Sequence, residues 1–242
     1  MKKAIGMILI VSIYFTFLFS GCASKASLKE EMLQPTQLRV VTMCVPRAGV
    51  KVYHSGGETA AIVTSVTGVG LGLAGPIADT SAKNWEATVE RDIYSAEVPR
   101  FFELVREKFI EKVNWEIPDW QPVVVDDEGV GPEVVNSLQR DPGLLLVLAS
   151  GSSYSNPPNS CVPGLSTAHG LESKYCGRLY IHGRLVWEKY IKYESDHENR
   201  YRKIKEFSEN KWELFKQELE YAADIITNRL VEDLKREIRR AE

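Results

Sequence analysis

Leu144-Leu145-Leu146-Val147-Leu148 is the stretch of this 242-residue sequence that says most about the fold. All five residues are aliphatic, and the turn sequence Asp141-Pro142-Gly143 stands directly before them. A short apolar run after a turn is typical of a strand that is buried on both faces. We therefore expect this segment to be a central strand of a sheet.

Further strands are predicted on both sides of this segment. Residues 38–45, 50–53 and 123–125 are rich in β-branched and other apolar residues. Residues 178–181 and 185–188 flank His182-Gly183, which predicts a tight hairpin turn.

Helices are predicted where apolar residues recur every three or four positions. Residues 82–96 and 102–113 form a two-part amphipathic helix interrupted at Pro99, with Asp79 or Ser81 as N-cap. A short helix is predicted over 132–139. Ser195-Asp196-His197-Glu198 fits a capping box, so one long C-terminal helix is expected to begin there. The pattern indicates a single α+β (or α/β) domain with a mixed sheet.

The first residues have the parts of a secretory signal peptide. Met1-Lys2-Lys3 is positive, residues 4–20 are apolar and free of charge, and small residues follow. Phe19-Ser20-Gly21-Cys22 resembles the lipobox of bacterial lipoproteins, in which the peptide is cleaved before a cysteine that carries the lipid. Phe19 departs from the family pattern, which prefers Leu at that position.

This resemblance implies a location and a domain organisation. Residues 1–21 would be the signal peptide, 22–37 a tether that begins at the palmitate-bearing Cys22, and 38–242 a periplasmic domain. In the family, Asp after the lipidated cysteine favours retention in the inner membrane. Ala23 therefore implies the outer membrane, facing the periplasm. The alternative is an uncleaved signal anchor, which places the body on the same side.

Residues 59–78 form an uncharged, glycine-rich segment inside the predicted domain. Small residues recur at four-residue spacing, which marks helix association in apolar segments. The segment is either a docked loop and helix of the domain, or a membrane-inserting or self-associating element. In the second case the residues in question are Gly68, Gly70, Gly72 and Ala74. The spacing Gly70-x-Gly72-x-x-Gly75 matches a dinucleotide fingerprint, but Pro76 follows at once and no nucleotide is expected.

Charge and cysteine content restrict the possible functions further. The chain has 30 basic and 33 acidic residues, a net charge of −3, and loss of Lys2 and Lys3 with the leader would give −5. No basic excess is available for nucleic-acid binding. Cys161 and Cys176 bracket a 16-residue loop, and a disulfide between them is predicted in an oxidising compartment. Cys44 is either a buried apolar residue or an alternative bridge partner.

Candidate catalytic residues are few. The four histidines form none of the usual metal motifs, so no metal or other cofactor is expected. The loop Ser150–Ser153 follows the central strand, and a hydrolase with Ser152, His169 and Asp126 is one hypothesis. The acids at 126–128 would be paired carboxylates or a weak cation site, although exposed acids at a strand end are common without either role.

Residues 183–188, Gly-Arg-Leu-Val-Trp-Glu after the strand 179–181, resemble a recurring hairpin of periplasmic lipoprotein domains. Examples are the curli-secretion lipoprotein, the lipoprotein activators of peptidoglycan synthases and the amino-terminal domain of the Tol translocation protein. The similarity covers about residues 120–240 as an order of elements. It implies a non-catalytic domain that contacts other envelope proteins, sometimes in rings.

The leading hypothesis is thus an outer-membrane lipoprotein that acts as an assembly or accessory module of an envelope complex. Its partners would be the bilayer, through acylated Cys22, and other envelope proteins or further copies of itself. The alternatives are a cell-wall or ester hydrolase that uses the Ser150–Ser153 loop, and an oligomerising or membrane-inserting protein that uses residues 59–78.

Overall fold

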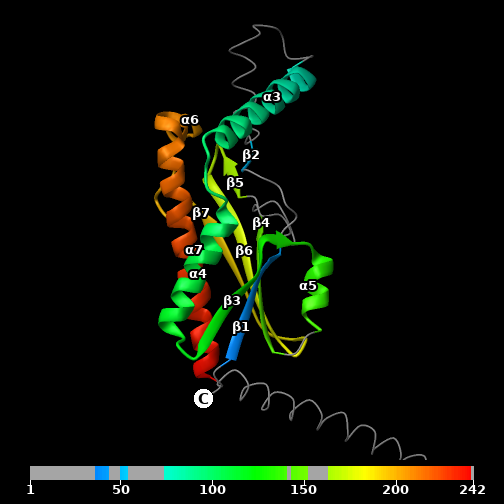
Figure 1. The fold of residues 1–242 in the computed structure, drawn as a ribbon. Coiled ribbons are helices and arrows are strands. Elements are labelled where there is room, and N and C mark those ends of the chain that lie inside the picture. Colours follow the sequence, from blue (N-terminus) through cyan, green and yellow to red (C-terminus); the bar gives the residue numbers. More distant parts are fainter. Residues whose placement is uncertain (1–35, 44–49, 54–73, 141–142, 152–162, 241–242) are drawn as a thin grey trace, which may run out of the picture.

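The computed structural model describes residues 36–43, 50–53, 74–140, 143–151 and 163–240 (Figure 1). Within these ranges the chain forms one mixed sheet of seven strands with helices packed against it. The predicted α+β domain with a mixed sheet and a long C-terminal helix is therefore confirmed.

The strands follow the order β2–β5–β6–β4–β1–β3, and β7 pairs with β6. Their bounds are β1 (Thr36–Met43), β2 (Lys51–Tyr53), β3 (Trp120–Val130), β4 (Leu144–Gly151), β5 (Gly164–Ser166), β6 (Gly170–Ile181) and β7 (Arg184–Glu194). β1 is parallel to β3 and β4, and β2 is parallel to β5. β6 is antiparallel to β4, β5 and β7. Because β6 is long, β4 and β5 lie end to end along one of its edges, and β7 pairs along the opposite edge.

Two long helices cover one face of the sheet. α4 (Phe101–Glu116) and α7 (Glu213–Arg239) lie side by side there, and the short α5 (Pro132–Leu138) lies on the other face (Figure 1). α3 (Ala74–Ser95) sits at one end of the sheet, where Glu90 Oε1 accepts a hydrogen bond from Val52 N at 3.0 Å. α6 (Ile204–Ser208) and the 3-10 turn Glu209–Trp212 lead into α7.

Strand β4 is buried on both faces, as predicted for residues 144–148. Leu144, Leu146 and Leu148 belong to the main core beneath α4 and α7. Leu145 and Val147 belong to a smaller core beneath α5. None of the five is more than 2% exposed.

The apolar stripes predicted for the helices form the other wall of the main core. They are buried in α4 and α7, whereas in α3 Val89 and Ile93 are buried, and Trp85 and the adjoining Ala96 are half-buried. The buried stripe residues are Val89, Ile93, Phe102, Val105, Phe109, Val113, Phe215, Leu219, Ala222, Ile226, Leu230 and Leu234.

The C-terminal helix does not begin at Ser195, so this prediction was wrong. Ser195 is fully buried beyond the end of β7, and its Oγ accepts a hydrogen bond from Leu171 N at 3.1 Å. The hydroxyl thus accepts a hydrogen bond from the backbone of the neighbouring strand and does not cap a helix N-terminus. α7 begins at Glu213, because residues 210–212 have positive φ values of 48°, 55° and 64° that no α-helix accommodates.

Helix α3 begins at Ala74, earlier than the predicted caps at Asp79 and Ser81. Pro76 is compatible with this start, because the first turn of a helix needs no backbone N–H from it. Gly68, Gly70 and Gly72 lie outside the described residues, so the role predicted for residues 59–78 stays a prediction. In the part of the chain that the structure describes, no helix is long and apolar enough to cross a membrane.

The hairpin predicted at His182-Gly183 is confirmed. β6 and β7 are joined by these two residues, whose φ values of 46° and 75° are both positive. Positive φ at both central positions is the mark of the type I′ turn, which matches the twist of the flanking strands.

Candidate functional site

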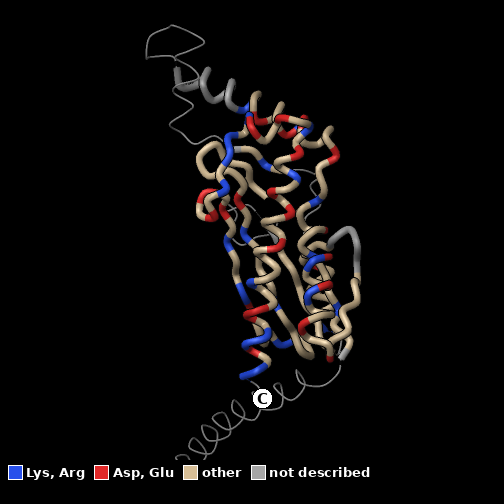
Figure 2. The backbone as a smooth tube through the Cα atoms, turned by 90° about the vertical axis from the view of Figure 1, so that its left-hand side faces the viewer, with Lys and Arg blue, Asp and Glu red and all other residues tan. Residues whose placement is uncertain are grey.

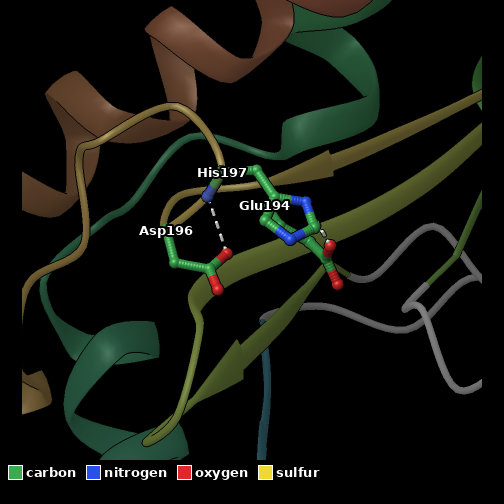
Figure 3. A group of neighbouring side chains, drawn as sticks. All are labelled: Glu194, Asp196 and His197. Atoms are coloured by element: carbon green, nitrogen blue, oxygen red, sulfur yellow. Dashed lines mark hydrogen bonds and ion pairs between the residues drawn. The ribbon is translucent and has the colours of Figure 1, made fainter.

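A group of ionisable side chains gathers where β7 ends (Figure 3). Glu194 is the last residue of β7, and Asp196 and His197 follow it in the next turn; atoms of the three that could act as metal ligands lie within 4.8 Å of one another. His169, from the turn between β5 and β6, places Nδ1 2.8 Å from Asp196 Oδ2. We call these four residues the β7-end cluster. Antiparallel pairing of β5, β6 and β7 brings the two turns together.

Glu194 is the buried member of the β7-end cluster. Its side chain is 6% exposed, and its two oxygens face different partners: Lys192 Nζ at 2.5 Å and His197 Nδ1 at 2.8 Å. Glu172, also buried, lies directly opposite Glu194 in the neighbouring strand. Two carboxylates in opposed positions repel each other, so the ammonium group of Lys192 offsets an unfavourable pair.

His169 and Asp196 stabilise each other's charged forms. The hydrogen bond to Asp196 raises the pKa of His169, and the charges of Glu172 and Glu194 add to this effect. For Asp196, burial acts to raise the pKa, but hydrogen bonds from His169 and from the backbone N–H of His197 outweigh burial and lower it. The pair therefore holds a proton on the imidazole more firmly than an isolated histidine does.

The donor set of the β7-end cluster, carboxylate and imidazole, is one that zinc accepts. Here, however, the ammonium of Lys192 lies on one oxygen of Glu194 and would repel a metal cation. Each histidine Nδ1 also lies on a carboxylate oxygen. In this arrangement the side chains of the β7-end cluster form ion pairs with one another and with Lys192. The chemical property that the arrangement favours is the binding of a proton by His169.

A second buried carboxylate lies behind the cluster, on α7. Glu218 Oε1 accepts hydrogen bonds from Tyr193 Oη and from Ser195 Oγ, and Oε2 accepts one from Arg200 Nε at 2.8 Å. The guanidinium of Arg200 also stacks 4.1 Å from the ring centroid of Tyr221. Burial, together with the hydrogen bond to Glu218, raises the pKa of Tyr193 well above its usual range. This network fastens the end of β7 and the turn after it to α7.

Of the three residues in the hydrolase hypothesis, the structure describes the side chain of His169 alone. Ser152 and Ser153 lie outside the described residues, as do the side chains of Ser150 and Asp126. His169 is described, and its carboxylate partner is Asp196, the position that the hypothesis assigned to Asp126. The hydrolase hypothesis stays untested at its serine.

Cys176 is a buried free thiol on β6. Its Sγ lies 3.9 Å from Glu188 Oε1, and burial raises its pKa to about 11. Its predicted bridge partner Cys161 lies outside the described residues, as do Cys22 and Cys44. The Cys161–Cys176 bridge therefore stays a prediction.

The sheet face that carries α5 also exposes apolar side chains on its outer strands. Val123 and Val125 on β3 are 41% and 40% exposed, and Leu185 and Tyr190 on β7 are 48% and 50% exposed. The register places them on this face, because Val123 pairs with Arg39, which neighbours core-facing Leu38 and Val40, and Tyr190 pairs with Cys176. β3 and β7 lie at opposite edges of the sheet, so these are two separate pairs of exposed apolar side chains, which together we call the α5-face patch.

No protein-family model, curated protein or solved structure matches the chain. Sequence reasoning missed Glu194, Asp196 and Glu218 as a group. Glu218 is 22 positions beyond Asp196 in the chain, and no local motif joins them.

Proposed function

We propose that the protein is a lipid-anchored, non-catalytic accessory module of a bacterial envelope complex, held at the outer membrane and facing the periplasm. The observation that carries the proposal is the sequence Phe19-Ser20-Gly21-Cys22 at the end of an apolar leader. Acyl chains on Cys22 would bind a bilayer by about 0.8 kcal/mol per buried methylene. Strand β1 begins at Thr36, near the end of the proposed tether 22–37, so a short tether joins the proposed anchor to the folded body.

The α5-face patch supports the part of the proposal that concerns partners. Apolar and aromatic side chains are enriched where proteins contact one another, so each edge of this face offers two such side chains to a partner. Tyr190 is held in position, because Arg178 Nη2 donates to its hydroxyl at 2.9 Å. A fixed, half-exposed tyrosine suits the centre of an interface.

The anchor is tested by growth with a radioactive palmitate analogue and by fractionation of the cell membranes. We expect label on the wild-type chain, none on Cys22→Ser, and release of that variant from the outer-membrane fraction. Cys44→Ser is the matched control and should keep both label and location. An unlabelled wild-type chain would overturn the proposed anchor.

The accessory role is tested with a photo-crosslinking amino acid placed at Val123 or Tyr190 in intact cells. We expect discrete adducts with envelope proteins or with a second copy of the chain. Glu107, exposed on α4 at the opposite side of the molecule, is the control position. Adducts that form equally at all three positions, or at none, would contradict a partner surface on the α5 face.

A further inference from the structure

We propose that one end of the folded body is a membrane-contact surface for anionic phospholipid. This end is formed by Trp115 in the last turn of α4 and by Arg236, Arg239 and Arg240 at the C-terminal end of α7; we call these residues the membrane-contact end. The inference rests on the proposed anchoring for the identity of the membrane. Its test is independent of acylation.

Trp115 is the first observation. Its side chain is 82% exposed, whereas Trp120, Trp187 and Trp212 are each 5% exposed or less. The indole ring combines a large apolar surface with one N–H donor, and tryptophan is enriched where proteins meet the headgroup region of a bilayer. An isolated, fully displayed tryptophan at one end of the body thus suits a lipid surface.

Basic side chains lie at the same end of the body as Trp115, on the last turns of α7. Lys235 Nζ lies 2.7 Å from Oε2 of Glu116, which ties the last turns of α7 to the last turn of α4. Lys and Arg are frequent along this part of α7, beside the C-terminus (Figure 2). Asp233 and Glu237 also lie here, each 3.2 Å from an arginine nitrogen at the surface. Such exposed pairs are weak, so phosphate groups can compete with these carboxylates for the guanidinium groups.

The chain enters the body at the same end. Thr36, the first residue of β1, pairs with Trp120 at the start of β3, and β3 follows α4 after a short connection. The 14 residues from Cys22 to Thr36 can span at most about 50 Å. An anchor at that distance keeps the body at a high local concentration near the lipid, so a weak contact is enough to orient it.

The test uses the leader-free chain, residues 22–242, with Cys22→Ser. Every described helix and strand and both cores come from residues 36–239, so removal of the leader leaves them intact. We expect this chain to bind vesicles that contain phosphatidylglycerol, to bind phosphatidylcholine vesicles much less, and to detach as salt is raised. The fluorescence of Trp115 should shift to the blue on binding.

Substitutions within the membrane-contact end locate the contact. Trp115→Phe should remove the blue shift, and joint replacement of the three arginines by glutamate should weaken vesicle binding at least about tenfold. Tyr94→Phe and Arg91→Glu, exposed on α3 away from this end, are the matched controls and should change nothing.

The outcomes separate the two proposals. If the unacylated chain fails to bind anionic vesicles at low salt, or if the arginine variant binds as well as wild type, the membrane-contact surface is overturned and the anchor stands. If the wild-type chain carries no lipid on Cys22 in cells, the proposed anchor is overturned. Vesicle binding by the unacylated chain would then still support the surface.

Discussion

Arg200 Nε lies 2.8 Å from Oε2 of Glu218, a carboxylate on α7 whose side chain is 3% exposed. The other oxygen of Glu218 accepts hydrogen bonds from Tyr193 and Ser195. One buried charge therefore joins the last residues of β7, the turn that follows and the longest helix. Three donors on one carboxylate are what a buried charge needs in order to be tolerated.

Removal of this charge should destabilise the domain. We expect Glu218→Gln to lower the free energy of unfolding by about 1–3 kcal/mol, because Arg200 loses its counter-charge and three donors share a weaker acceptor. Urea denaturation followed by circular dichroism measures the difference. Glu220→Gln, exposed on the same helix, is the control and should change stability by less than about 0.5 kcal/mol. Equal effects of the two substitutions would show that the network contributes nothing to stability.

The pair His169–Asp196 predicts a pH dependence of stability with a definite sign. The pKa of His169 is raised from 6.5 in the folded state, so its contribution is complete below pH 6.5 and is lost as pH rises through the raised value. The pKa of Asp196 is lowered from 3.8, so its contribution is present above pH 3.8 and is lost as pH falls through the lowered value. Both contributions are therefore complete between pH 3.8 and pH 6.5.

Two measurements check this pH dependence. The difference in unfolding free energy between wild type and His169→Gln should shrink as the solution is made alkaline, and Asp196→Asn should abolish that trend. The imidazole resonance of His169 should titrate above 6.5 in the wild-type chain and at a lower pH in Asp196→Asn. A His169 resonance that titrates at the same pH in both chains would contradict the pair.

Gly177 on β6 is predicted to tolerate no side chain. A Cβ at this position would lie 2.8 Å from two ring atoms of Trp187 and 3.2 Å from Leu230 Cδ2. The indole cannot move away freely, because its Nε1 donates to Asp233 Oδ2 at 3.1 Å. We expect Gly177→Ala to cost about 1–3 kcal/mol of stability and to lower the thermal midpoint.

Gly131 provides the control for this substitution. Its φ is −73°, and nothing lies within 4 Å of the position that a Cβ would take. Gly131→Ala should leave the thermal midpoint unchanged or raise it slightly, since alanine lowers the entropy of the unfolded chain. A larger loss for Gly131→Ala than for Gly177→Ala would refute the packing argument.

The thiol of Cys176 should react slowly in the folded protein. Burial raises its pKa to about 11, so little thiolate is present near neutral pH. We expect iodoacetamide to modify Cys176 after unfolding in denaturant and to leave it unmodified in the native chain, as read by peptide mass spectrometry. If Cys176 stays unmodified in denaturant until a reductant is added, it forms a disulfide, and peptide mass spectrometry then shows whether its partner is Cys161 or Cys44.

Local sequence patterns correctly predicted those elements whose burial or backbone conformation depends on their own residues. Leu144 to Leu148 are apolar in succession, and this strand is buried on both faces because helices cover both sides of the sheet at β4. His182-Gly183 predicted a turn correctly, since a two-residue hairpin loop depends on the φ values of those two residues.

The full length of β6 and β7 depends on pairing between the two strands, which local sequence patterns do not show. The hairpin strands were expected over 178–181 and 185–188, yet β6 and β7 extend over Gly170–Ile181 and Arg184–Glu194. Glu172, Lys174, Lys192 and Glu194 are charged and depart from strand composition, but they pair across the two strands. Cross-strand pairing satisfies the backbone there, although the directly opposed side chains carry like charges, and Lys192 offsets Glu194 from within β7. No window of sequence reveals this arrangement.

The sequence by itself determined the α+β class, the central strand, the apolar stripes of the helices and the hairpin turn, because each depends on the periodicity or composition of one segment. The tertiary structure alone decided where the polar residues meet. Ser195 fits a capping box in sequence, but in the structure its hydroxyl is hydrogen-bonded to Leu171 N and to Glu218. Residues 210–212 have positive φ, so the helix cannot extend back beyond Glu213. The helix begins later than its sequence predicts because Ser195 is bonded to distant segments instead of capping a helix, and because the backbone at 210–212 is not helical.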